Sequence, residues 1–291
     1  VDVVLFSTYV WNYRMSLEIA RRLKDEQPEA VIAFGGPQVP DHAEEFLREH
    51  PFIDLACHGE GELTSLAILE HWPSRDWGAV PGITYLDQGG RLLRNPKAPR
   101  IKDLASTPSP YLEGVFAPLM EANPNAQWIA MWESNRGCPF SCTFCDWGSA
   151  VQAKVYTFDM ERLFREIEWF GRHKIDFVWC CDANFGILPR DIDLASHFVE
   201  IKRKYGFPGA LTVQNTKNAT ERAYQVQKIL SDGGLNKGVD LALQSLDPGT
   251  LKSVKRANIS SETYQELQRR FTRDKVDTYT DLIAPLPGET Y

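Results

Sequence analysis

The chain has 291 residues, of which 43% are hydrophobic and 24% charged, a composition typical of a soluble globular protein with room for two domains. Its net charge of −7 gives no electrostatic support for nucleic-acid binding, and no apolar run approaches the length of a membrane span. Six cysteines without a visible signal peptide argue against a secreted disulfide scaffold, so we expect a cytoplasmic protein with neither a nucleic-acid partner nor a membrane partner.

The first 75 residues alternate short apolar runs with amphipathic segments, a pattern typical of a parallel sheet built from strand-helix units. Strands are predicted at 3–7, 30–34 and 53–57, with helices between them. Three strands are too few for a covered sheet, so we expect further strands upstream. The chain begins and ends within predicted elements, which indicates an internal fragment of a larger protein.

The turns that follow these three strands are rich in glycine, polar and aromatic residues. In an open parallel sheet, ligands bind beyond the carboxyl ends of the strands, and glycine allows the backbone to approach a ligand closely. Neither a GxGxxG motif nor a Walker loop is present, which removes the main support for a nucleotide ligand. The candidate ligand-facing residues are Ser7, Tyr9, Val10, Trp11, Asn12, Gly35, Gly36, Gly59, Glu60 and Gly61.

A hairpin is predicted next, with 82–85 pairing against 91–93, followed by a proline-containing linker up to residue 126. From residue 127 onward, strand and helix patterns alternate again. Strands are predicted at 128–132, 177–181, 210–214, 239–243 and 278–283, with amphipathic helices between them. Five strand-helix repeats suit an open or incomplete barrel.

Cys138, Cys142 and Cys145 form a CxxxCxxC motif in the loop after the strand at 128–132. This spacing lets one loop bind three irons of a four-iron cluster and leaves the fourth iron open to an added ligand. The alternative metal is zinc, but structural zinc takes four ligands, and the chain has no second cysteine pair at zinc-site spacing. The adjacent Cys180 and Cys181 lie in an apolar run and are expected to pack in a strand.

The motif, with the aromatic Phe144 before its last cysteine, resembles the signature of radical S-adenosylmethionine (radical SAM) enzymes. The resemblance implies a 4Fe-4S cluster whose open iron is chelated by S-adenosylmethionine. Polar residues at later strand ends are similar to the family's SAM contacts, with Arg256 facing the SAM carboxylate or, alternatively, lying on the surface of the next helix. The implied SAM-binding residues are Phe144, Asp182, Asn184, Gln214, Gln244, Ser245 and Arg256.

Residues 1–75 resemble the cobalamin-binding domain that precedes the cluster in cobalamin-dependent radical SAM enzymes, where a serine and aromatic-rich loop, a Gly-Gly-Pro turn and a Gly-Glu-Gly-Glu turn surround the corrin. Tyr9 and Trp11 would pack under the corrin, or else serve ordinary packing at a domain junction. The DxHxxG motif that supplies cobalt's axial histidine in many cobalamin proteins is absent, and a lone histidine such as His58 is more often structural. The axial ligand stays open.

The resemblance implies an α/β fold: a partial doubly wound, Rossmann-like cobalamin-binding domain (1–75), a hairpin and linker (76–126) and a partial (β/α) radical SAM barrel (127–291). The implied activity is a methyltransferase that uses methylcobalamin and a deoxyadenosyl radical to methylate an unactivated carbon of a small natural product or peptide. An external electron donor such as a flavodoxin or ferredoxin would reduce the cluster. Three alternatives stay open: a non-methylating rearrangement or cyclisation enzyme, a non-catalytic cobalamin or iron-sulfur sensing module, and a tRNA methylthiotransferase, which the acidic charge disfavours.

Overall fold

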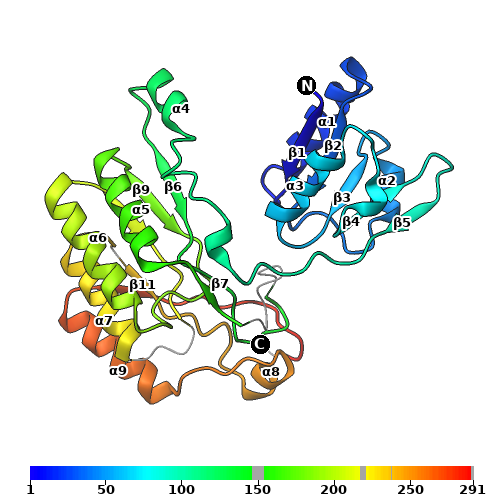
Figure 1. Cartoon of the computed structure of the whole chain (residues 1–291). Helices are drawn as coiled ribbons and strands as arrows, with labels where there is room; N and C mark the ends of the chain where they lie inside the picture. Colours follow the sequence, from blue (N-terminus) through cyan, green and yellow to red (C-terminus); the bar gives the residue numbers. More distant parts are fainter. Residues whose placement is uncertain (146–153, 217–220, 237, 290–291) are drawn as a thin grey trace. The chain divides into compact units, whose positions relative to one another are not determined.

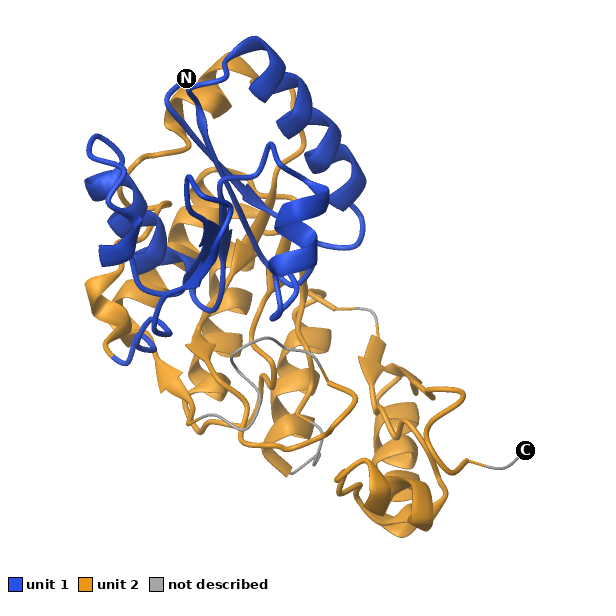
Figure 2. Ribbon diagram, turned by 90° about the vertical axis from the view of Figure 1, so that its right-hand side faces the viewer, with its two compact units in different colours: residues 1–102 blue, residues 103–291 orange. Residues whose placement is uncertain are grey.

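The computed structural model describes residues 1–145, 154–216, 221–236 and 238–289. The chain divides into two compact units, residues 1–102 and 103–291, which are drawn in different colours in Figure 2. Among the described residues, no helix combines the length and the apolar character needed to cross a membrane.

Unit 1 contains a five-stranded sheet in the order β1-β2-β3-β4-β5 (Figure 1). The strands β1 (Val3–Ser7), β2 (Val31–Gly35) and β3 (Leu55–Cys57) are parallel, as their alternation with helices predicts. The expected hairpin forms β4 (Ile83–Leu86) and β5 (Leu92–Arg94). Because β4 pairs antiparallel with β3, the hairpin extends the sheet of unit 1 rather than standing apart from it.

Helices cover both faces of the unit 1 sheet. Successive residues of a strand point to opposite faces, so alternate residues of β2 pack against different helices. On one face, Ile32 and Phe34 pack with residues of α1 (Tyr13–Glu26) and α2 (Glu44–Glu49). On the other, Val31 and Ala33 pack with Ile68 of α3 (Gly61–His71). Burial on both faces explains why β2 reads as a continuous apolar run, and it confirms the doubly wound character of the sheet.

Unit 2 contains a parallel three-stranded sheet in the order β10-β9-β6 and a parallel pair, β11-β12. Helices α5, α6 and α7 pack one on the next along one side of these strands (Figure 1). In the described residues the two sheets are separate, so the expected incomplete barrel takes the form of two short sheets. The bounds are β6 (Ile129–Trp132), α5 (Met160–Arg172), β9 (Phe177–Cys180), α6 (Asp191–Tyr205), β10 (Ala210–Thr212), α7 (Glu221–Asp232), β11 (Gly238–Asp240), α9 (Ser261–Arg273) and β12 (Asp277–Tyr279).

The core of unit 2 lies between the sheet and these helices, and Trp132 is its largest fully buried side chain. The Trp132 ring meets Phe198 of α6 edge-on at 5.1 Å between centroids. Its Nε1 donates to the buried Glu166 carboxylate of α5 at 2.9 Å, and Glu166 also accepts from Arg162. The last residue of β6 is therefore fixed by both packing and hydrogen bonding, which anchors the start of the loop that carries the three cysteines.

The remaining short elements connect these parts of the fold. They are the 3-10 helices η1 (Trp77–Ala79) and η2 (Leu104–Ser106), the helices α4 (Ala117–Ala122) and α8 (Pro248–Ser253), and the antiparallel strands β7 (Asn135–Arg136) and β8 (Tyr156–Thr157).

Candidate functional site

The cysteine loop leaves the carboxyl end of β6 and is fastened to its surroundings at several points. Gly137 has φ +131, and a Cβ added there would lie 2.5 Å from the Lys154 carbonyl oxygen, so glycine is required. Farther along, the Thr143 amide donates to the Val254 carbonyl just after α8 at 2.9 Å. The loop path is therefore set by contacts on both sides of Cys138.

Of the three loop cysteines, Cys138 and Cys142 are buried and Cys145 is partly exposed, and none of them forms a disulfide. Within the described residues, no three Cys, His, Asp or Glu side chains converge on one point as ligands of a single metal ion would. A four-iron cluster does not require such convergence, because each thiolate binds a different iron.

The other three cysteines lie at the ends of strands and stay protonated. Burial raises the pKa of Cys57 to about 12 and that of Cys181 to about 11, and it raises the pKa of Cys180 well above the usual range. These groups have the properties expected of strand packing, whereas metal ligands must be deprotonated.

Asp182 lies two residues beyond the end of β9 and is completely buried. Its Oδ1 accepts hydrogen bonds from the backbone amides of Ser134 (2.7 Å) and Asn135 (3.1 Å). Its Oδ2 accepts from Ser134 Oγ (2.5 Å) and Asn135 Nδ2 (2.7 Å). The sequence predicts a SAM contact for Asp182. In the structure, all four donors that its carboxylate accepts from belong to the segment that leads into the cysteine loop.

Asn184 lies two residues farther along the same turn and is 2% exposed. Its Nδ2 donates to Cys138 Sγ at 3.2 Å. Its Oδ1 is buried and has no hydrogen-bond partner among the described residues. Leaving a buried carbonyl oxygen without a hydrogen-bond donor costs free energy. The position of Asn184 Oδ1 beside the cysteine loop therefore fits a site in which a bound group supplies an N–H donor to this oxygen.

Arg256 is buried in the structure, which excludes the alternative of a surface arginine. Its Nε donates to Asn258 Oδ1 at 2.7 Å, and its Nη2 donates to the Ala242 carbonyl. Its Nη1 is buried without a partner in the part of the chain that the structure describes. A guanidinium held on two sides and open on the third fits a ligand carboxylate, for which its fork geometry is suited.

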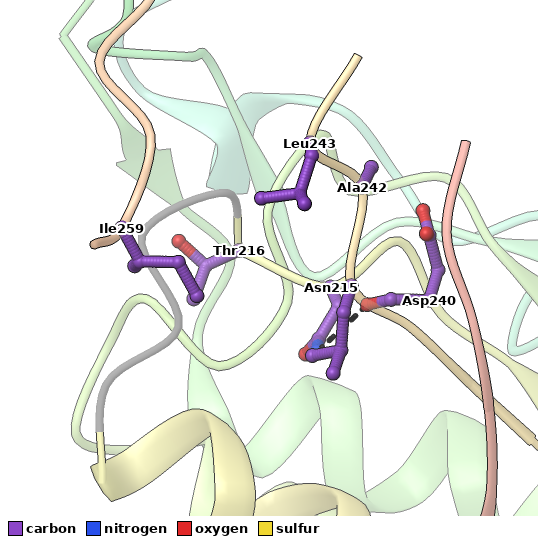
Figure 3. Close-up of a pocket in the computed structure, with 7 residues that line it drawn as sticks. Asn215, Thr216, Asp240, Ala242, Leu243 and Ile259 are labelled. Carbon is purple, nitrogen blue, oxygen red and sulfur yellow. Dashed lines mark hydrogen bonds between the residues drawn. The ribbon is translucent and has the colours of Figure 1, made fainter. Parts of the chain in front are cut away.

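A small cavity lies beyond the carboxyl ends of β10 and β11 (Figure 3). Its volume of about 20 Å³ is room for one water molecule and not for a cofactor. Asn215 donates from Nδ2 to the Asp240 carbonyl across the cavity, at 3.3 Å. Burial raises the pKa of Asp240 to about 6, with Asp281 acting in the same direction and Arg256 against it. The lining residues are Asn215, Thr216, Asp240, Leu241, Ala242, Leu243 and Ile259.

The other predicted SAM-binding residues are partly or fully engaged with the protein. Ser245 is buried and donates from Oγ to Glu289 at 2.8 Å. Gln244 has φ +67, and its backbone pairs with Asp281 and Ile283 at 2.8 Å each, so it joins the ends of the β11 and β12 segments. Gln214 accepts from the Phe185 amide at 2.7 Å through its carbonyl, and its side chain, like Phe144, is partly exposed.

In unit 1, the turn after β1 is closely fitted to the turn after β2. Thr8 is fully buried and donates from both its amide and its hydroxyl to the Gly35 carbonyl, each at 2.8 Å. Gly36 has φ +95, and a Cβ there would lie 2.6 Å from the Thr8 carbonyl oxygen. Gly36 is therefore needed for the close approach of these two turns, whereas a Cβ at Gly35 would make only ordinary contacts.

The serine and aromatic-rich loop presents its aromatic residues to solvent. Asn12 holds the loop, since its Oδ1 accepts from the Tyr9 amide at 2.7 Å and its Nδ2 donates to the Ser7 carbonyl at 2.9 Å. Tyr9 and Trp11 stack at 4.7 Å, and Trp11 and Val10 are each 76% exposed within the structure. An ordered, exposed aromatic stack at the carboxyl end of a parallel strand is suited to contact a large flat ligand.

The Gly59-Glu60-Gly61 turn leaves space in front of α3. A Cβ at Gly59 or at Gly61 would meet no described atom within 4 Å, so packing does not explain glycine at Gly61. Glu60 turns inward and accepts from the Ile101 amide at 2.6 Å. His58 also turns away from this space: its Nε2 pairs with Thr84 Oγ1 at 3.0 Å, and burial lowers its pKa. His58 is thus held by the hairpin, which agrees with its expected structural role.

Several residues of these networks escape sequence reasoning. Ser134 and Asn135 belong to the segment whose sequence resembles the family, but only the structure shows that Asp182 binds both. Asn258 stands beside the predicted Arg256 and orients it. The sequence shows only that a polar residue adjoins a predicted site residue. It does not show which atoms of the two residues form hydrogen bonds.

Comparison with known proteins identifies the class of this site. The family profile described as "B12 binding domain" matches residues 1–69, and the profile described as "Radical SAM superfamily" matches residues 132–291. The cobalamin-dependent radical SAM methyltransferase TokK of Streptomyces tokunonensis is 40% identical over 99% of this chain. The chain belongs to the cobalamin-dependent radical SAM enzymes.

A second relative, the 2-(S-pantetheinyl)-carbapenam-3-carboxylate methyltransferase of Streptantibioticus cattleyicolor, is 39% identical over 99% of the chain. The chain spans 43% of the length of each of these two relatives. Among solved structures, the cobalamin-dependent radical SAM enzyme OxsB matches 97% of the chain with a TM-score of 0.71, covering 41% of OxsB. The methyltransferase TsrM of Kitasatospora setae matches 99% with a TM-score of 0.70, covering 57% of TsrM. At 18% and 16% identity, these two likenesses show the fold.

Family membership gives the cofactors as a [4Fe-4S] cluster, SAM and cobalamin, as the cysteine motif and the first-domain turns predict. The residues present fit these groups. The cysteine loop carries three cysteines that form no disulfide, Asn184 and Arg256 each hold a buried polar atom without a partner in the described chain, and the Gly59 to Gly61 turn leaves open space.

Proposed function

We propose that this protein is a methyltransferase that adds a methyl group to an unactivated carbon of a small carbapenam-type molecule. The observation that carries the proposal is the alignment, over 99% of the chain, with two methyltransferases at 39% and 40% identity, one of which is named as a cobalamin-dependent radical SAM enzyme. One of them is named for a pantetheinyl carbapenam carboxylate, which gives the substrate class.

In this proposal Cys138, Cys142 and Cys145 hold the cluster, and an external one-electron donor such as a flavodoxin or ferredoxin reduces it. When bound, these cofactors supply a SAM-derived radical that removes a hydrogen atom from the substrate and a methylcobalamin that donates the methyl group. The chain itself binds, orients and shields them from water.

For SAM, we assign Arg256 to the carboxylate and Asn184 to the amino group. Arg256 Nη1 and Asn184 Oδ1 support this assignment, because one is a buried donor and the other a buried acceptor, and both lack partners among the described residues. Phe144, Gln214, Gln244 and Ser245 stay predicted contacts. For cobalamin, the exposed Tyr9 and Trp11 stack and the open Gly59 to Gly61 turn support a corrin-binding surface on unit 1.

The test is an anaerobic reaction of the reconstituted, cobalamin-loaded protein with reductant, a pantetheinyl carbapenam carboxylate and SAM that carries a deuterated methyl group. The proposal predicts a product heavier by one deuterated methyl group, together with deoxyadenosine and S-adenosylhomocysteine. A transformed product without added methyl would show a rearrangement or cyclisation enzyme instead. Intact SAM would indicate a non-catalytic module.

Matched cysteine variants distinguish the loss of a cluster ligand from the destabilisation caused by removing any buried thiol. Cys142→Ala should abolish cluster assembly and SAM cleavage, because each thiolate binds its own iron. Cys180→Ala removes another buried thiol, which packs in β9, and should retain iron and sulfide. Loss of the cluster in the folded Cys180 variant would show that a fourth protein ligand exists.

A further inference from the structure

We infer that Asn184 is a positioning residue that sets the reduction potential of the cluster through its hydrogen bond to Cys138. The inference rests on the proposed cluster at Cys138, Cys142 and Cys145, and it goes beyond the contact with the SAM amino group assigned above. It concerns the other end of the same side chain, Nδ2, which lies 3.2 Å from Cys138 Sγ.

The orientation of the Asn184 amide follows from the chemistry of its neighbour. A cysteine that binds iron is a thiolate, which can only accept hydrogen bonds. The nitrogen end of the amide must therefore face Cys138, and the oxygen end must face away. This is the arrangement observed, with Nδ2 on Cys138 Sγ and Oδ1 left for another donor.

Asn184 is held firmly enough to keep this bond. On its amino-terminal side, Asp182 is fixed by its four hydrogen bonds to Ser134 and Asn135. On its carboxyl-terminal side, the Phe185 amide donates to Gln214 at 2.7 Å, and the Phe185 carbonyl accepts from Thr216 at 3.2 Å. The turn is thus tied to the cysteine loop on one side and to the β10 end on the other.

Burial makes this bond strong. Asn184 is 2% and Cys138 is 3% exposed, so water competes little with the N–H donor. A reduced cluster carries one more negative charge than the oxidised form, and a donor on a ligand sulfur stabilises the more negative state. Hydrogen bonds to the sulfurs are among the features that set the potentials of such clusters. The Asn184 bond should therefore raise the potential and make the cluster easier to reduce.

The test is a redox titration of the reconstituted protein, in which EPR measures the reduced cluster in wild type and in Asn184→Leu, a variant of similar volume without a donor. We expect unchanged iron and sulfide content and reduction that is about tenfold less favourable at a fixed potential. For a one-electron couple this is a shift of about 59 mV to lower potential. The matched control is Asn236→Leu, because Asn236 Nδ2 donates to Gln227 rather than to a cysteine.

A potential unchanged in Asn184→Leu, with the cluster intact, would overturn the inference and leave the proposed function standing. A wild-type protein that assembles no cluster would instead overturn the proposed function. Should Asn184→Leu not retain its cluster, Asn184→Ala removes the same donor and leaves a cavity in place of a bulky group. The same fall in potential is expected for that variant, and its absence would likewise refute the inference.

Discussion

Removing the Asp182 carboxylate should destabilise unit 2 strongly, because this one group accepts from four donors in the segment that leads into the cysteine loop. Asp182→Ala would leave the Ser134 amide and hydroxyl and the Asn135 amide buried without an acceptor, and it would leave Asn135 Nδ2 only its 3.3 Å bond to Ser134 Oγ. Each stranded donor costs about 1 to 3 kcal/mol, and partial relaxation of the loop recovers part of this sum. We expect a loss of about 3 to 5 kcal/mol in the free energy of unfolding.

Asp182→Asn should cost less, about 1 to 2 kcal/mol, because its remaining oxygen still accepts from both backbone amides. Its new NH₂ group faces the Ser134 hydroxyl, which can turn to accept, and the Asn135 amide, which can flip. The comparison of the two variants therefore separates loss of the acceptor from loss of the charge.

The Asp182 charge also predicts how stability depends on pH. Burial raises the pKa of Asp182 from 3.8 to about 7, despite its hydrogen bonds. Between these two values the folded protein binds more protons than the unfolded chain, so the contribution of Asp182 to stability falls as pH rises, by about 1.4 kcal/mol per pH unit and about 4 kcal/mol in total. Asp182→Asn cannot titrate and should lose this dependence.

The assay is urea unfolding at several pH values between 5 and 8, read by hydrogen-deuterium exchange in the peptide that contains residues 133–138. Comparison of variants at the same pH removes the intrinsic pH dependence of exchange. A loss below about 1 kcal/mol in Asp182→Ala, or parallel pH curves for wild type and Asp182→Asn, would refute the role assigned to this carboxylate.

Three further substitutions test other parts of the site. Gly137→Ala should prevent assembly of the cluster in a folded protein, because its Cβ would lie 2.5 Å from the Lys154 carbonyl oxygen, and normal iron content would contradict the required close approach. Arg256→Met should weaken SAM binding about tenfold or more, measured by equilibrium dialysis with the cluster present, whereas unchanged affinity would remove Arg256 from the SAM site. Glu166→Leu should lower the unfolding free energy by about 2 kcal/mol or more, since Trp132 Nε1 would lose its buried acceptor, and a neutral effect on thermal unfolding would contradict this.

The sequence predicts the strand-helix order well, because buried parallel strands and amphipathic helices leave clear patterns. Strand β1 has the predicted bounds, whereas β11 ends at Asp240, earlier than predicted, since the chain leaves the sheet before Gln244 turns with positive φ. The cysteine motif is equally readable, because its spacing alone restricts the chemistry.

The roles of single polar residues are harder to predict. Asp182 and Asn184 occupy one turn and look equivalent in sequence. Asp182 nevertheless accepts hydrogen bonds from backbone amides, whereas Asn184 donates to a cysteine sulfur. Which atoms they reach depends on the path of the loop after β6, a contact across 46 residues of sequence for Asn184 and Cys138. Local sequence patterns carry no information about contacts between residues so far apart in the chain. The sequence therefore indicates a polar site but does not show which atoms each polar residue contacts.

The central claim is that one chain carries both a corrin and a four-iron cluster on the residues named above. The most direct measurement is the absorption spectrum of protein purified anaerobically with cobalamin available, with cobalt, iron and sulfide counted on the same sample. We predict corrin bands together with a broad sulfur-to-iron charge-transfer shoulder, and loss of the shoulder alone in Cys138→Ala. Corrin bands without the shoulder in the wild-type protein would contradict the assignment of the Cys138 loop, and a shoulder without corrin would contradict that of unit 1.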